Sequence, residues 1–261
     1  MPFVGAGMSM ASGFPSWSDL LERMCADSPL VQAAVDGHTD NGRFEEAAQA
    51  VADFLGPNQF HADLEAEIGF NGYEIQGPVK LLPYSFSAGC ITTNLDNVLE
   101  RVFRESTNRF DQEVWGENLR EQQGYLNPDE NKLFKLHGTA TARAGRIITR
   151  DEYQNTYDNN ISLSQVLAAI VANRSLLFLR CSLTVDRTIR ALSDICANSQ
   201  VNPPSHFAFL PLTPDTDRES RRTELARANI APIWYPCENR DDHEAHIEDL
   251  LICLAEGGVD D

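Results

Sequence analysis

The amino-acid sequence predicts an α/β protein built on a Rossmann-like, doubly wound and mostly parallel sheet. Short apolar segments of strand length alternate with segments of helical periodicity along most of the chain, which is the pattern of such sheets. A glycine-rich turn, Gly5-Ala6-Gly7, follows the first apolar segment, and polar residues follow two later ones at Asn94 and His137. Ligands bind at the carboxyl ends of the strands in open α/β sheets. These positions therefore locate the candidate site.

The hydrophobic pattern also predicts where the core elements lie. Short apolar runs predict strands, and apolar residues three or four apart predict helices. Ser16 or Ser18 is expected to cap the first helix. The polar stretch 106–131 is expected to be an irregular surface excursion. The predicted strands cover 1–4, 90–93, 133–136, 176–179, 206–210 and 230–235, and the predicted helices cover 17–24, 95–105, 163–173, 189–195, 223–229 and 244–255.

A helical insert is predicted at about 36–87, between the first and second strands. Apolar residues recur there at helical period, from Phe44 to Ile68, with no strand-like run among them. The pair Gly56-Pro57 is expected to divide the insert into two helices. It would form a lid or one wall of a cleft, or simply pack against the sheet. The whole chain, 1–261, is expected to be a single domain.

Charge and hydropathy restrict the classes of partner. The 261 residues carry a formal net charge of −18, and a surface this acidic disfavours direct binding to nucleic acid, whose phosphates require Lys and Arg. No run approaches the roughly 18 apolar residues of a membrane span. Met1 is followed at once by a turn-forming sequence without a basic start, so a cytoplasmic protein is expected.

The six cysteines do not predict a metal site. None of them forms the Cys-x-x-Cys pair that is typical of structural zinc, so no zinc module and no bound metal are expected. Most lie in apolar runs, where cysteine usually acts as a small core residue. They are interpreted as reduced, buried thiols: Cys25, Cys90, Cys181, Cys196, Cys237 and Cys253.

The glycine-rich turn can hold a diphosphate, because glycines let the backbone amides approach phosphate oxygens at the start of a helix. The usual dinucleotide pattern needs a third glycine, and this chain has Met10 there. A mere tight connection therefore remains an alternative. Pro15 and Trp17 follow in a rigid loop, where the indole is available to flank a ring.

The two later segments each have a functional and a structural interpretation. In Thr92-Thr93-Asn94-Leu95-Asp96 the polar groups are placed to meet a ligand, or Asn94 caps the next helix and Asp96 lies in its first turn. His137 before Gly138 suits a general base because its ordinary pKa is near neutrality. An isolated histidine is, however, more often bonded to a backbone carbonyl.

Two weaker signals lie further along the chain. Ser182 follows a buried strand and is placed to bind a ribose or phosphate oxygen, while Asp186 is expected simply to cap the next helix. His243 and His246 stand at i and i+3 beside acidic residues, but a third metal ligand is missing from the pattern. No Gly-x-Ser-x-Gly elbow supports a serine hydrolase.

In this order, the segments resemble the sirtuin superfamily, and specifically its bacterial branch of NAD hydrolases in antiphage defence. The resemblance covers residue 3 to about 190 and includes two further segments, 149–153 and 179–186. It departs from the deacylases, which have four zinc-binding cysteines and an arginine after the Gly-x-Pro loop. It also departs from the family before Ser182, where Arg180-Cys181 replaces a glycine. The matching motifs are Gly5-Ala6-Gly7-x-Ser9, Gly13-x-Pro15-x-Trp17, Thr93-Asn94-x-Asp96 and His137-Gly138.

The resemblance implies a sirtuin-like, NAD-binding domain that hydrolyses NAD, its substrate, to nicotinamide and ADP-ribose. It assigns Asn94 to the ribose and the attacking water, and His137 to general-base catalysis. Asp96 would fix the nicotinamide end. The turn residues Gly5, Ala6, Gly7 and Ser9 would hold the diphosphate, with Pro15, Trp17 and Ser182 as further binding residues.

Two alternatives remain open at this point. One is an NAD-dependent protein deacylase, and the other is a non-catalytic subunit that senses NAD or ADP-ribose. The resemblance also implies a homo-oligomer that acts with a partner such as a DNA-translocating ATPase or a short Argonaute. The acidic surface is compatible with a protein whose contact with nucleic acid is left to that partner.

Overall fold

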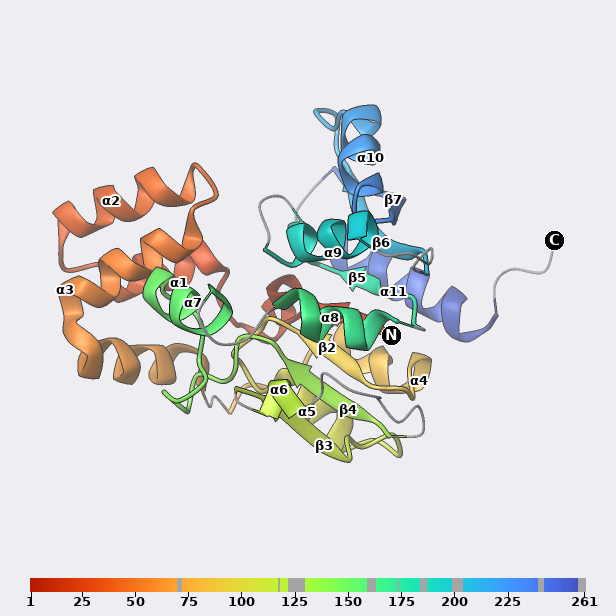
Figure 1. Ribbon diagram of the computed structural model, residues 1–261, viewed down its shortest axis with the longest axis horizontal. Helices are drawn as coiled ribbons and strands as arrows, with labels where there is room; N and C mark the ends of the chain where they lie inside the picture. Colours follow the sequence, from red (N-terminus) through yellow and green to blue (C-terminus); the bar gives the residue numbers. More distant parts are fainter. Residues whose placement is uncertain are drawn as a thin grey trace.

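Seven strands form one sheet in the computed structural model, which describes residues 1–69, 72–116, 118–121, 130–158, 163–172, 174–183, 187–198, 204–238 and 242–257. The strands are β1 (Pro2–Val4), β2 (Cys90–Thr92), β3 (Gln112–Trp115), β4 (Lys132–Lys135), β5 (Leu177–Leu179), β6 (His206–Leu212) and β7 (Ile230–Pro236). Their order in the sheet is β3-β4-β2-β1-β5-β6-β7 (Figure 1). Every neighbouring pair in this sheet is parallel.

The sheet is doubly wound around its central strand. In β1, Phe3 pairs with Ile91 of β2 on one side and with Phe178 of β5 on the other. The chain passes from β1 to β2, then to the edge strand β3 and to β4, and it crosses to the opposite side of β1 only at β5. The strand order therefore reverses between β1 and β5, where open α/β sheets bind their ligands.

Helices cover both faces of the sheet, because successive strand residues point to opposite sides. Val4 and Leu179 belong to one core cluster, which includes residues of α1, α3, α5 and α11, whereas Phe3 and Phe178 belong to the other, with α8, α9 and α10. The helices are α1 (Trp17–Met24), α2 (Pro29–Thr39), α3 (Phe44–Leu64), α4 (Leu82–Ser85), α5 (Val98–Arg104), α6 (Asn118–Glu121), α7 (Arg150–Tyr153), α8 (Leu163–Val171), α9 (Arg187–Asn198), α10 (Arg218–Ala226) and α11 (Asp242–Ala255).

Helices α1 to α4 lie between β1 and β2 in the chain, and α1, α2 and α3 gather with α7 at one end of the sheet (Figure 1). Ser16 caps α1 in a capping box with Asp19, as the sequence predicts. Gly56 has φ 76° inside α3 and bends it, so the predicted break is present. Helix α2 already begins at Pro29, before the predicted start of the insert near 36, because proline suits the first helical turn.

The prediction for 106–131 as an irregular excursion is wrong in part. Strand β3 lies there and forms the edge of the sheet against β4. Only Val114 of this strand is fully buried. The segment therefore lacks the apolar run from which a strand is predicted. The predicted helix 95–105 begins only at Val98, because the Asp96 carboxylate accepts a hydrogen bond from the Val98 amide at 3.0 Å.

The interpretation of all six cysteines as buried thiols also needs correction. Cys25, Cys90 and Cys237 are buried, whereas Cys181 and Cys196 are half-buried and Cys253 is exposed on α11. Within the described residues, no group of three or more His, Cys, Asp or Glu side chains is arranged to hold a metal ion. The same part of the chain contains no helix that is long and apolar enough to cross a membrane.

Candidate functional site

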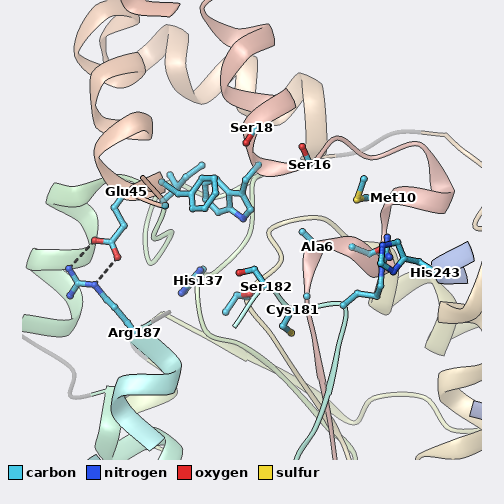
Figure 2. Close-up of a pocket in the computed structure, with 18 of the residues that line it drawn as sticks. Ala6, Met10, Ser16, Ser18, Glu45, His137, Cys181, Ser182, Arg187 and His243 are labelled. Carbon is cyan, nitrogen blue, oxygen red and sulfur yellow. Dashed lines mark hydrogen bonds and ion pairs between the residues drawn. The ribbon is translucent and has the colours of Figure 1, made fainter. Parts of the chain in front are cut away.

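A cavity of about 430 Å³ lies at the carboxyl ends of the strands (Figure 2). Its lining comes from the segments that follow β1, β2, β4 and β5, from β6 and β7, and from α1, α3, α7, α9 and α11. This volume is in the range of small-molecule sites. A second cavity of about 30 Å³ adjoins it, and both are lined by Ala6, Ser16, Trp17 and Thr93.

The structure brings the predicted site residues together around these two cavities. The larger cavity is lined by Gly5, Ala6, Gly7, Trp17, His137 and Ser182. The smaller cavity is lined by Ser9, Pro15, Asn94 and Asp96, and also by Ala6 and Trp17. The rest of the fourth segment, Thr184 to Asp186, lies outside the described residues.

The glycine-rich turn is packed tightly against the loop after β5. The Gly5 amide donates to the Leu179 carbonyl at 3.0 Å. A Cβ at Gly5 would lie 2.5 Å from the Arg180 oxygen and 2.8 Å from the Cys181 Cα. Gly5 is thus required by the close approach of two backbones, which the sequence pattern does not distinguish from the approach of a phosphate.

Asn94 is held by the ends of β1 and β2. The Asn94 backbone amide donates to the Thr92 hydroxyl at 2.9 Å, and that hydroxyl donates to the Val4 carbonyl at 2.8 Å. The Asn94 side chain donates from Nδ2 to the Ser9 hydroxyl at 3.2 Å, while its buried Oδ1 accepts no hydrogen bond from the described residues. The capping alternative is wrong, because Asn97 occupies the N-cap position of α5.

Asp96 lies buried beside Asn94, at the wall of the smaller cavity. Burial raises the pKa of its carboxyl group, although hydrogen bonds from the Val98 amide and the Ser9 hydroxyl act in the opposite direction. Lys135 donates from Nζ to the Asp96 carbonyl at 2.6 Å and pairs with Glu100. Asp96 therefore stabilises the loop as well as facing the cavity.

His137 is 7% exposed and contacts the tyrosine that ends α7. The Tyr153 hydroxyl lies 3.2 Å from Nε2 and 3.3 Å from Nδ1, and the two rings meet edge to face. Burial, and to a smaller extent the nearby Arg187, lower the pKa of His137 to about 3. Its imidazole is consequently neutral at physiological pH and can accept a proton.

An ion pair between α9 and α3 lies beside this histidine. Arg187 donates to the Glu45 carboxylate from Nε at 2.8 Å and from Nη2 at 2.9 Å (Figure 2). The guanidinium also lies over the Tyr153 ring, 5.0 Å from its centre. Sequence reasoning did not find this pair, since 142 positions separate its members.

The opposite end of the cavity holds Arg180, Tyr235 and His243. Arg180 has a left-handed backbone, φ 54°, and its Nε donates to the Gly7 carbonyl at 3.3 Å. The Tyr235 hydroxyl lies 2.8 Å from His243 Nδ1 and is also hydrogen bonded to Arg180. The sequence pattern suggested His243 only as a weak metal ligand, and no local signal indicates its place in the cavity.

Two curated relatives carry the same name, NAD(+) hydrolase ThsA. The protein from Enterococcus faecium is 25% identical over 223 residues, which are 80% of this chain and 42% of the relative. The protein from Cytobacillus dafuensis is 25% identical over 186 residues, which are 68% of this chain and 34% of the relative. The chain thus spans less than half the length of these relatives.

The SIR2-like domain family matches residues 88–233. This match covers more than half of the chain and includes every strand from β2 to β6 and most of β7. Asn94, Asp96, His137 and Ser182 lie within it, and the glycine-rich turn lies before it. The chain belongs to the SIR2-like domain family.

Proposed function

We propose that this protein is an NAD hydrolase, which cleaves NAD to nicotinamide and ADP-ribose. The observation that carries the proposal is the meeting of three strand-end segments, those of Gly5, Asn94 and His137, at two adjoining cavities. The two relatives named as NAD(+) hydrolases support the substrate. The volume of the larger cavity suits a ligand of this size class.

The reaction needs a site that holds a cationic ribose and supplies water. The bond between the nicotinamide nitrogen and the ribose C1 breaks, and nicotinamide leaves as a neutral molecule with the bonding electron pair. The oxocarbenium-like ribose then gains a water oxygen at C1, and that water loses a proton. An acceptor for the proton and a group that orients the water are therefore required.

Asn94 fits the orienting role because its Oδ1 is buried and accepts no hydrogen bond from the described residues. A buried acceptor without a donor is costly, and a ribose hydroxyl or a water would supply the donor. Asp96, in the same small cavity, is assigned to the nicotinamide end. Ser9 holds the Asn94 amide in place.

His137 is assigned as the proton acceptor. Its imidazole is neutral, since its pKa is lowered to about 3, and a neutral ring nitrogen accepts a proton from water or a ribose hydroxyl. A low pKa also makes it a weak base, so the diphosphate of the substrate is expected to raise it by attraction between opposite charges. Gly5, Ala6, Gly7, Pro15, Trp17 and Ser182 are assigned to binding.

The biological setting proposed here rests on the family resemblance. We infer a cytoplasmic effector of antiphage defence that forms a homo-oligomer and acts with a partner such as a DNA-translocating ATPase or a short Argonaute. Nicotinamide release by the protein with and without such a partner would test this setting. Release that is unchanged by every partner would count against it.

The decisive experiment is nicotinamide release from NAD alone, without an acyl-lysine substrate. His137→Ala and Asn94→Ala are each expected to lose activity by about 100- to 10,000-fold. His38→Ala, on α2 and outside both cavities, is the matched control and should keep full activity. Full turnover by His137→Ala would remove this histidine from the mechanism, and binding of NAD without turnover by the wild type would favour a sensor.

A further inference from the structure

The end of the cavity away from His137 is built around a half-buried arginine. Arg180 lies directly after β5, and its side chain fills the space beside the glycine-rich turn. A Cβ at Gly7 would lie 2.8 Å from both Cβ and Nε of Arg180. The absence of a side chain at Gly7 therefore leaves room for the cationic side chain of Arg180. The Gly7 carbonyl also accepts a hydrogen bond from the Arg180 Nε.

No ion pair joins Arg180 to a carboxylate of the described residues. Among the residues described as lining the cavity, Glu45 is the single acid, and it pairs with Arg187 instead. In a chain with a net charge of −18, an arginine without such a partner is unexpected. Because a partly buried cation is costly without a counter-charge, this end of the cavity is suited to an anion.

Tyr235 and His243 hold the arginine and extend the polar surface. The Tyr235 hydroxyl is hydrogen bonded to Arg180 and lies 2.8 Å from His243 Nδ1, so the three side chains form one connected group from the loop after β5, from β7 and from α11. A guanidinium is the protein cation best shaped for phosphate, since its planar donors bind two oxygens at once.

We propose that Arg180, supported by Tyr235 and His243, binds a phosphate of the dinucleotide. This inference rests on the proposed function. The phosphate comes from one of two sources that share this chemistry: the diphosphate that links the two nucleosides, or a phosphate on the adenosine ribose, as in NADP. The absence of a carboxylate among the described lining residues at this end matches the second source, because an acid there would repel a ribose phosphate.

Calorimetric titration tests the proposal without relying on turnover. Wild type and Arg180→Gln are titrated with ADP-ribose, with ADP-ribose 2′-phosphate and with adenosine. Loss of a hydrogen-bonded charge pair is expected to weaken phosphate binding by about 10- to 100-fold, while adenosine binding stays unchanged. Arg180→Lys should bind at an intermediate affinity, since it keeps the charge but loses the planar donors.

Two controls separate binding from folding and from net charge. Thermal unfolding of Arg180→Gln shows whether the loop after β5 stays intact. Arg174→Gln removes one positive charge from a half-buried arginine that donates to the Ala88 carbonyl and lies outside the cavity, so it should bind all three ligands as the wild type does.

The outcomes assign the phosphate or reject the proposal. Weaker binding of both ADP-ribose ligands identifies the diphosphate, and weaker binding of the 2′-phosphate ligand alone identifies the ribose phosphate. If the wild type and Arg180→Gln bound both ADP-ribose ligands with equal affinity, the proposed role of Arg180 would be wrong. The proposed hydrolase activity would be unaffected by that result. Arg180-dependent binding without any nicotinamide release would instead reject the hydrolase alone.

Discussion

The two ends of the larger cavity use the same three residue types in different ways. One end has His137, Tyr153 and Arg187, and the other has His243, Tyr235 and Arg180. In both groups the histidine and tyrosine rings meet edge to face, with centres 5.1 Å apart at one end and 5.8 Å apart at the other. The groups differ in the counter-charge, because Glu45 pairs with Arg187 and no described carboxylate pairs with Arg180.

The counter-charge, and not the residue types, therefore decides which role each group of side chains is suited for. Burial keeps the pKa of His137 low and its imidazole neutral, as the proposed proton acceptor requires, and Glu45 offsets part of the Arg187 charge that lowers this pKa further. At the other end the positive charge of Arg180 is left for a ligand. The cavity is thus polarised along its length, with a neutral end at His137, where we propose that the reaction occurs, and a cationic end at Arg180, where we propose that a phosphate binds.

The largest effect is expected from a substitution that creates a steric clash with the backbone at the Arg180 end of the cavity. In Gly5→Ala, the new Cβ would meet the Arg180 oxygen at 2.5 Å and the Cys181 Cα at 2.8 Å. Backbone atoms cannot move aside as a side chain can, so a loss of about 1–3 kcal/mol in the free energy of unfolding is expected. Urea denaturation measures it, and the affinity for ADP-ribose should fall as well.

Gly37→Ala provides the control for this substitution. Gly37 lies within α2, and a Cβ there would meet nothing within 4 Å. Alanine is the better helix former, so the variant should gain about 0.5–1 kcal/mol. If Gly5→Ala were as stable as the wild type, the two loops would not need their close approach, and the assignment of Gly5 would be wrong.

A smaller effect is expected from making the His137 end resemble the Arg180 end. Glu45→Gln removes the carboxylate that pairs with Arg187, and the positive charge would then disfavour the protonated form of His137 more strongly. A lower pKa makes the imidazole a weaker proton acceptor, so nicotinamide release is expected to fall, by at most about tenfold for each unit by which the pKa drops. Nicotinamide release is measured at saturating NAD, so that a change in turnover is separated from a change in binding.

The double variant Glu45→Gln with Arg187→Gln tests whether Glu45 acts through Arg187. It removes both charges, so it should recover part of the turnover that Glu45→Gln loses. A double-mutant cycle gives this coupling directly. Additive losses would show that Glu45 does not act through Arg187, and the contrast between the two ends would then not depend on the counter-charge.

The sequence predicts the residues at the strand ends, but it does not predict the contacts between side chains across the cavity. The parallel sheet and the position of His137 follow from apolar runs that end in polar residues, which is a local signal. Strand β3 was missed because Val114 is its only fully buried residue, and local periodicity cannot show an edge strand of this kind.

The remaining parts of the site depend on tertiary structure. Glu45 and Arg187 lie in the first turns of α3 and α9 and meet at the wall of the cavity, and neither residue stands in a motif. Arg180 stood out in the sequence as a departure from the family pattern, yet its fit against Gly7 needed coordinates. Pairing between distant side chains is the information that a single sequence lacks.

The smallest expected effect concerns the neutral state of the buried histidines. Burial lowers the pKa of His137 to about 3 and that of His206 to about 4, from an ordinary 6.5. A lowered pKa means that the unfolded chain binds the proton more tightly than the folded chain does. The free energy of unfolding is therefore at its full value above pH 6.5, and it decreases as the pH falls toward 4 and then 3. Each histidine should contribute a loss of about 1 kcal/mol over the first pH unit below 6.5.

Urea denaturation at pH 6.5 and 5.5 measures this loss, and His206→Gln separates the two histidines. Nδ1 of His206 accepts a hydrogen bond from the Leu176 amide at 3.2 Å, and glutamine keeps an acceptor while it cannot titrate. The variant should therefore show a smaller loss than the wild type, with the remainder belonging to His137 and to the carboxyl groups. An equal loss in both proteins would mean that His206 is not held neutral by burial. If His137→Asn also left the loss unchanged, the neutral reacting end of the cavity would lose its physical basis.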